Sequence, residues 1–246
     1  MDCHFKFSGR VAPGSLLHST KQDAPDGALV PPSYEHRSNW GDIPVYGPTV
    51  VDNSTGYNPA GNCNGNFMSS KFQPNNNCYA YGCNITPNSF PQPGRYSDAK
   101  HIFAGHSIAP VEVVVAGAIA DGLLNVGTTL DDCRAFAQTN PPSVGHFVAL
   151  MYSPSESAIG GDPEANWPGD YHWARCDDLE NNAWSQKDGS DQVTNFDFAG
   201  NPITDPATAN WRVNQGPIGG GDANEYRASY YFHTYMFVPY GKVNIL

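Results

Sequence analysis

The chain has 246 residues, of which 39% are hydrophobic, and a formal net charge of −11 with only 13 Lys and Arg residues. This length and apolar content suffice for one main domain with a buried core. Binding to nucleic acid through phosphate neutralisation needs clustered Lys and Arg residues. Because this chain has few of them, we do not expect nucleic acid as a partner. No run of about 18 apolar residues occurs, so we expect no membrane span.

Residues 1–70 have Pro, Gly and Asn every few positions and only short β-prone pieces. This pattern predicts a long irregular N-terminal arm, followed by a globular domain over residues 71–246. Aromatic residues such as Tyr34 and Trp40 indicate that the arm docks on a surface, because disordered segments are poor in aromatics. That surface is either the chain's own domain or a neighbouring subunit. The N-terminal residues lack the basic and apolar parts of a secretory signal, so we expect no Sec-type export.

Three helices are predicted along the next part of the chain. A short helix begins at Cys78 and ends before Pro87. Residues 110–124 are apolar on nearly all sides, which predicts a buried core helix. A third helix is expected over residues 130–138, where Thr129 and Asp132 have the spacing of a capping box.

The remainder of the chain favours strands. Residues 145–152, 171–176 and 230–238 are short runs rich in aromatic and β-branched side chains. Helices followed by strands predict an α+β fold in which short helices pack on an antiparallel sheet.

Cys78 is the first candidate for chemistry. At a helix N-terminus the free amide groups and the helix dipole favour the reactive thiolate. A nucleophilic cysteine also needs a base within hydrogen-bond reach, and His146 and His172 each open a predicted strand. They would lie side by side if these strands pair. The alternatives are an inert buried thiol at Cys78 and structural roles for both histidines.

A cysteine at a helix start, followed by a strand opening GlyHisPheValAlaLeu and a second strand with a polar residue near its start, resembles the papain-like superfamily, especially its NlpC/P60 and CHAP branches. The resemblance covers roughly residues 75–180. It implies that Cys78 is the nucleophile, His146 the base and His172 the residue that orients the base. Such an enzyme cleaves a peptide or amide bond.

Further residues would complete such a site. An oxyanion hole would combine the Cys78 amide with a side-chain amide just upstream, and the candidates are Gln73, Asn76 and Asn77. Three aromatic residues could line a substrate groove or fill a core instead: Tyr171, Trp173 and Trp184.

The order of short motifs is also similar to that of uncharacterised bacterial and phage proteins. Among the motifs are AsnCysTyrAlaTyr, AspTyrHisTrpAlaArg and TrpSerGlnLysAspGly. In the last of these, the resemblance implies that Gln186 stands where many relatives have His. If that histidine is catalytic, this chain is impaired or inactive.

The sequence therefore leaves two main functional hypotheses. The first is a thiol hydrolase acting on a peptide or peptidoglycan-type substrate without a cofactor. The alternative is a non-enzymatic structural or binding protein, such as a phage particle component, that binds neighbouring subunits through residues 1–70. A metal-dependent hydrolase that uses several His and Asp residues comes third. Part of a structural zinc site could be formed by Cys63, Cys78 and Cys83, but a convincing second ligand pair is missing, so no metal ligands are assigned. We expect the protein in the cytoplasm or in a phage particle.

Overall fold

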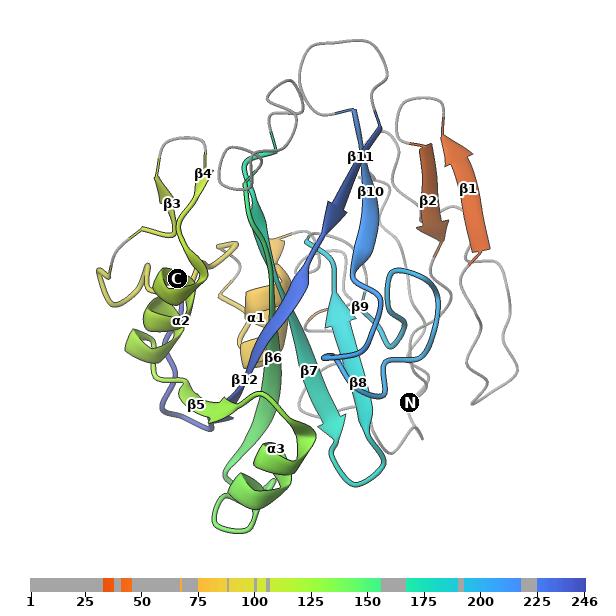
Figure 1. Ribbon diagram of the computed structural model, residues 1–246. Helices are drawn as coiled ribbons and strands as arrows, with labels where there is room; N and C mark the ends of the chain where they lie inside the picture. The colour runs from red at the N-terminus through yellow and green to blue at the C-terminus, as the bar shows by residue number, and fades with distance from the viewer. Residues whose placement is uncertain are drawn as a thin grey trace.

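The computed structural model describes residues 33–37, 41–45, 67, 75–87, 89–99, 101–104, 107–155, 167–189, 193–217 and 225–246. Its centre is a six-stranded antiparallel sheet with the strand order β5-β12-β6-β7-β8-β9 (Figure 1). The strands are β5 (Leu124–Gly127), β6 (Gly145–Ser153), β7 (Asp170–Asp178), β8 (Ala183–Lys187), β9 (Val193–Thr194) and β12 (Tyr231–Pro239). An antiparallel sheet with short helices is thus confirmed, but the described structure is mainly sheet.

Three antiparallel hairpins accompany the main sheet. They are β1 (Ser33–Arg37) with β2 (Gly41–Val45), β3 (Phe103–Ala104) with β4 (Ser107–Ile108), and β10 (Arg212–Pro217) with β11 (Glu225–Ser229). The first hairpin falls in the predicted irregular arm, so part of that arm forms strands. Phe67 is buried and its ring meets that of Tyr81 edge-on, 5.2 Å between centroids. The other residues of the arm lie outside the described residues, and its extent stays a prediction.

The short helix predicted at Cys78 is α1 (Cys78–Cys83). Asn77 caps it, because its side-chain oxygen accepts a hydrogen bond from the Ala80 amide at 3.1 Å. Asn84 ends the helix in a left-handed conformation, with φ of 56°. All six helical residues are buried, and α1 lies behind the sheet in Figure 1.

The capping box predicted the third helix correctly. Helix α3 (Leu130–Ala137) begins after Thr129, whose hydroxyl accepts from the Asp132 amide at 3.1 Å. The Asp132 carboxylate in turn accepts from the Thr129 amide at 2.9 Å. Two backbone amides at the start of the helix are thus satisfied reciprocally, which fixes where the helix begins.

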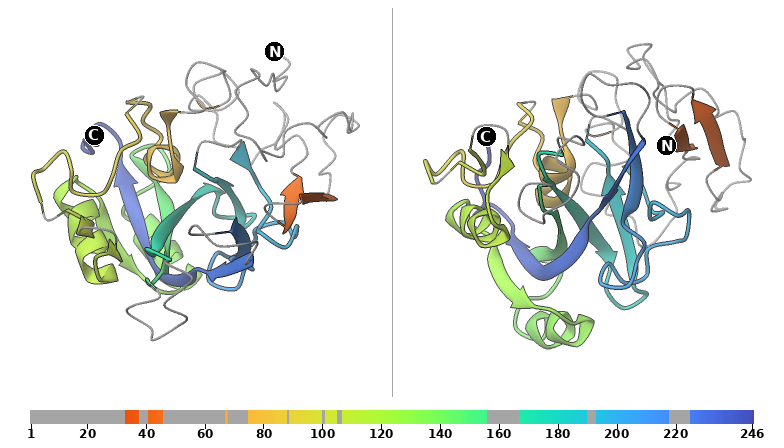
Figure 2. Two further views of the ribbon diagram at one scale, coloured as in Figure 1. Left: turned by 90° about the horizontal axis from the view of Figure 1, so that it is seen from above. Right: turned by 45° about the horizontal axis from the view of Figure 1, so that its top comes forward.

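The apolar stretch over residues 110–124 forms the shorter helix α2 (Val111–Ala120) and then β5. Its inner face is buried through residues such as Val114, and Gly117 lies so close to the carbonyl of Pro93 that an added Cβ would stand 2.7 Å from its oxygen. The opposite face is open to solvent, with Ile119 48% exposed. The prediction of a fully buried helix is therefore wrong, because α2 packs on the core from one side only (Figure 2).

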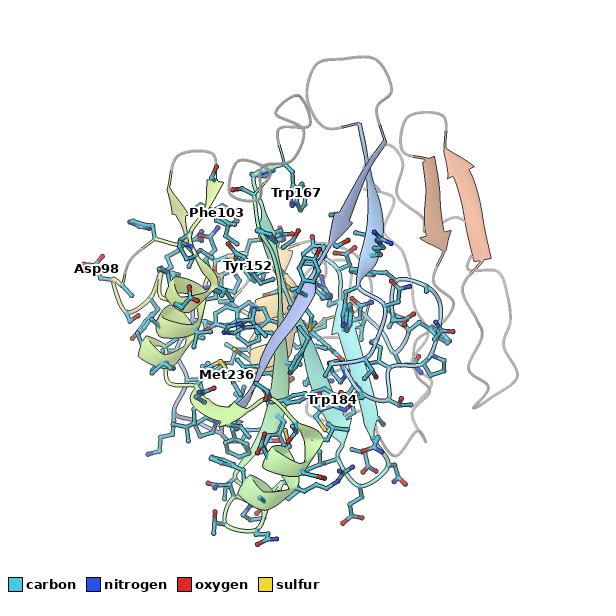
Figure 3. The ribbon with its side chains drawn as sticks, viewed as in Figure 1. Asp98, Phe103, Tyr152, Trp167, Trp184 and Met236 are labelled. Carbon is cyan, nitrogen blue, oxygen red and sulfur yellow. The ribbon has the colours of Figure 1, made fainter. Side chains whose placement is uncertain are left out.

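The sheet has a core layer on each face, because successive strand residues point to opposite sides. The layer on the α1 side contains Tyr79, Val114, Val148, Trp173 and Met236 among its buried residues. The other layer contains Cys133, Phe147, Ala174, Trp184 and Tyr235. Figure 3 labels Met236 of the first layer and both Trp167 and Trp184 of the other. This division decides which candidate site residues can meet.

Candidate functional site

Cys78 opens α1 but is not an activated thiol. Its side chain is 5% exposed, and its sulfur lies 3.9 Å from the carbonyl oxygen of Tyr171 in β7. Burial raises the pKa of the Cys78 thiol far above its usual value, and the negative charge of Asp170 raises the pKa further. Desolvation thus outweighs whatever the end of a six-residue helix contributes. The Cys78 thiol is thus buried, and its raised pKa favours the protonated form.

His146 lies on the same face of the sheet as α1 and forms a hydrogen bond with the C-terminal end of that helix. Its Nε2 atom donates to the Gly82 carbonyl at 2.6 Å, satisfying one of the carbonyls that a helix end leaves open. The Nδ1 atom is buried without a hydrogen-bond partner. Burial, together with the nearby positive charge of Arg175, lowers the pKa of His146 to about 3. These surroundings favour the neutral ring, whose hydrogen bond to Gly82 has a structural role at the end of α1.

His172 is fixed in the other core layer. Its Nε2 atom lies 2.5 Å from the side-chain oxygen of Gln186, whose amide nitrogen donates to the Phe196 carbonyl at 2.7 Å. Three aromatic rings lie within 6.1 Å of its ring centroid: Phe198, Trp211 and Tyr230. Burial lowers the pKa of His172 to about 4. Gln186 therefore has a clear structural partner in this chain.

The two histidines do not lie side by side, which corrects the prediction from the sequence. Strands β6 and β7 do pair, but antiparallel, so their first residues stand at opposite ends. His172 pairs with Met151, five residues along β6 from His146, or about 17 Å at the usual rise of a strand. The side chains also point to opposite faces of the sheet. His172 consequently cannot orient His146 toward Cys78.

Of the predicted oxyanion groups, Asn77 has a structural role in the described residues. Gln73 lies outside the described residues, and Asn76 is fully buried. The Asn77 side chain caps α1 with its oxygen and donates its amide to the Pro91 carbonyl at 2.7 Å. The Asn77 side chain thus ties the start of α1 to a neighbouring loop, and both its oxygen and its nitrogen atom are engaged in hydrogen bonds.

The predicted groove aromatics are core residues. Tyr171, Trp173 and Trp184 are 5%, 0% and 1% exposed. Tyr171 and Trp173 belong to the layer on the α1 side, whereas Trp184 belongs to the other layer. A groove formed by all three is therefore wrong, because the sheet itself stands between them. Their side chains fill the two cores, which is the alternative that the sequence left open.

A buried ionic network beneath α1 was missed by the sequence analysis. The guanidinium of Arg175 in β7 bonds Asp177 at 3.0 Å and donates to the Tyr81 hydroxyl at 2.8 Å. Arg175 also stacks over the Tyr81 ring, 4.1 Å from its centroid. Tyr81 continues the network to Ser185 in β8 at 2.6 Å. Opposite charges two residues apart in a strand share one face, and this was the signal available in the sequence.

Nothing in this arrangement pairs a nucleophile with a base. Among the described residues, no group of three or more His, Cys, Asp or Glu side chains could hold a metal ion. Within the same ranges, no helix is long and apolar enough to cross a membrane. The polar side chains of His146, His172 and Asn77 instead tie helices, loops and strands together.

The packed thiols give a direct chemical prediction. Cys78, Cys83, Cys133 and Cys176 are all buried and free, and burial raises the pKa of each. We expect a small alkylating reagent at neutral pH to modify these four only slowly in the folded protein and rapidly after denaturation. Mass spectrometry of timed samples measures the rates residue by residue. Rapid modification of Cys78 in the folded state would contradict the packed geometry.

Comparison with known proteins gives the relationship that the geometry alone does not. The chain is 33% identical over 147 residues to insoluble matrix shell protein 1 of Ruditapes philippinarum. The match takes in 58% of this chain and 76% of that protein. The chain belongs to the family of insoluble matrix shell protein 1. No protein-family model matches the chain, and no solved structure matches it either.

Membership of this family corrects the main functional prediction. The named relative is a matrix shell protein, so the thiol hydrolase interpretation is wrong, and with it the hydrolase and cysteine-peptidase descriptions. The comparison favours the non-enzymatic alternative. It lends no support to a cytoplasmic or phage-particle location. It does not test the papain-like resemblance as such, which stays a prediction.

Proposed function

We propose that this protein is a non-enzymatic structural protein that acts by associating with neighbouring subunits in a matrix. The observation that carries the proposal is the 33% identity to insoluble matrix shell protein 1 across 76% of that protein. The name of that relative describes an insoluble protein of a shell matrix, and association with neighbouring subunits is the role that we assign to this chain.

The interior described above supports this proposal. The side chains that looked catalytic in the sequence act as internal ties: His146 holds the end of α1, and His172 holds β8 through Gln186. Asp121, at the end of α2, accepts from the Tyr79 hydroxyl at 2.9 Å and the Gly94 amide at 2.7 Å. These ties join helices, a surface turn and the sheet into one scaffold.

The N-terminal arm supplies the first test of assembly. We expect the full-length protein to form concentration-dependent oligomers, and a chain lacking residues 1–60 to keep its fold but associate less. Removing residues 1–60 leaves Phe67 and the whole main sheet in place. Analytical ultracentrifugation measures the oligomers, and circular dichroism with thermal unfolding confirms the fold. A full-length protein that stays monomeric at all concentrations would contradict the proposed function.

A further inference from the structure

The outer face of α2 is unusual for a helix at the protein surface. Its partly or fully exposed positions include Val115, Ala116, Ile119 and Ala120, which fall on one side of the helix. A surface helix ordinarily carries polar and charged residues there. The element that follows α2 exposes an apolar side chain as well, because Leu124 at the start of β5 is 44% exposed. We call these five residues the α2 face.

The position of the α2 face leaves it open to another molecule. Helix α2 lies at the periphery in all the views (Figures 1 and 2). Strand β5, which follows it, is the outermost strand of the main sheet at this end. Contiguous exposed apolar residues at such a place are typical of an interaction surface. The small side chains of Ala116 and Ala120 also let a second helix approach closely.

The charges at the two ends of the α2 face identify the partner. Glu112 is exposed in the first turn of α2. At the other end, Lys242 is exposed, and its backbone packs directly against Gly122, two residues beyond the helix. The helix between them is about 15 Å long at 1.5 Å per residue. An acidic residue thus stands at the start of the helix, and an exposed basic residue lies beside the turn that follows its end.

This arrangement is complementary to itself when reversed. If two copies pack their α2 helices antiparallel about a twofold axis, Glu112 of each copy comes opposite Lys242 of the other, and the apolar strips meet between them. A twofold contact uses the same patch on both subunits, so each favourable pair occurs twice. Apolar burial supplies affinity, and the charges set the direction of packing.

We infer that the α2 face is a self-association surface, on which a second copy of this chain docks its own α2 antiparallel. The inference rests on the proposed function and deepens it, because it names the partner and the surface for assembly. It also explains why a helix that is apolar on nearly all sides occupies the edge of the fold: the second copy provides the burial that the monomer does not.

Sedimentation of the full-length protein over a range of concentrations tests the apolar strip. Ile119→Lys places a charge at the centre of the α2 face and should weaken association about tenfold or more. The matched control is Tyr231→Lys, which changes a 64% exposed side chain at the far end of β12 and should leave association unchanged. Thermal unfolding of both variants monitors the fold.

A charge exchange tests the antiparallel packing. Glu112→Lys and Lys242→Glu should each weaken association by placing like charges together, whereas the double variant should recover it. Because both positions are exposed, we expect all three variants to retain the fold. Recovery in the double variant is the result that supports a second copy packed antiparallel.

The outcomes separate the inference from the proposed function. Association that survives Ile119→Lys, or that does not recover in the double variant, overturns the α2 face while leaving assembly through another surface standing. A monomeric full-length protein overturns both. A monomer whose thermal stability drops sharply with Ile119→Lys also overturns self-association, since the face is then covered by another segment of the same chain.

Discussion

Replacing Arg175 with Met is expected to lower the free energy of unfolding by about 3–5 kcal/mol. The Arg175 and Asp177 side chains are 0% and 3% exposed, and their ion pair measures 3.0 Å. Removing the guanidinium leaves a buried carboxylate whose countercharge is gone, and it takes a hydrogen-bond donor from the Tyr81 hydroxyl. The penalty of an uncompensated buried charge dominates the loss. Denaturant unfolding followed by fluorescence measures it.

Two further variants make this prediction specific. Arg134 and Asp131 form an ion pair at 2.7 Å on the surface, with side chains 45% and 90% exposed. Arg134→Met should therefore cost at most about 1 kcal/mol. The double variant Arg175→Met/Asp177→Asn removes both charges and should be more stable than Arg175→Met alone. If Arg175→Met and Arg134→Met lower the free energy of unfolding by the same amount, the buried network does not hold α1 to the sheet.

The elements that the sequence predicted well have local causes. Helix α3 was predicted from Thr129 and Asp132, because a capping box forms within one turn and needs no distant partner. The short helix α1 was predicted from Cys78 and Pro87 for the same reason. The long strands β6, β7 and β12 follow from their β-branched and aromatic composition.

The predictions that were wrong concern features that depend on how distant segments of the chain pair. His146 and His172 each open a strand, and only the antiparallel register places them at opposite ends and on opposite faces. Nothing within either strand reveals that register. The exposure of Ile119 likewise depends on where the sheet ends, since the apolar pattern of α2 is the same for a helix buried by its own fold or by a second copy.

The buried histidines predict a marked loss of stability in acid. The pKa values of about 3 for His146 and about 4 for His172 lie below the 6.5 of an ordinary histidine. Below pH 6.5 the unfolded chain therefore binds protons that the folded chain does not, so stability falls as the pH falls. Between pH 6.5 and 5 the loss is about 2 kcal/mol for each histidine. Asp170 acts in the opposite direction, because burial raises its pKa to about 6.

Comparison of variants isolates the contribution of one histidine from that of Asp170. His172→Gln keeps an amide donor for Gln186 but removes the titrating ring. We expect the stability difference between wild type and His172→Gln to shift by about 2 kcal/mol in favour of the variant between pH 6.5 and 5. Phe198→Leu alters the same aromatic surroundings without changing a titratable group, so its profile should run parallel to that of the wild type. Chemical denaturation at a series of pH values provides the comparison. A parallel profile for His172→Gln would show that His172 binds its proton equally in the folded and unfolded states, contrary to its burial between Gln186 and the aromatic rings.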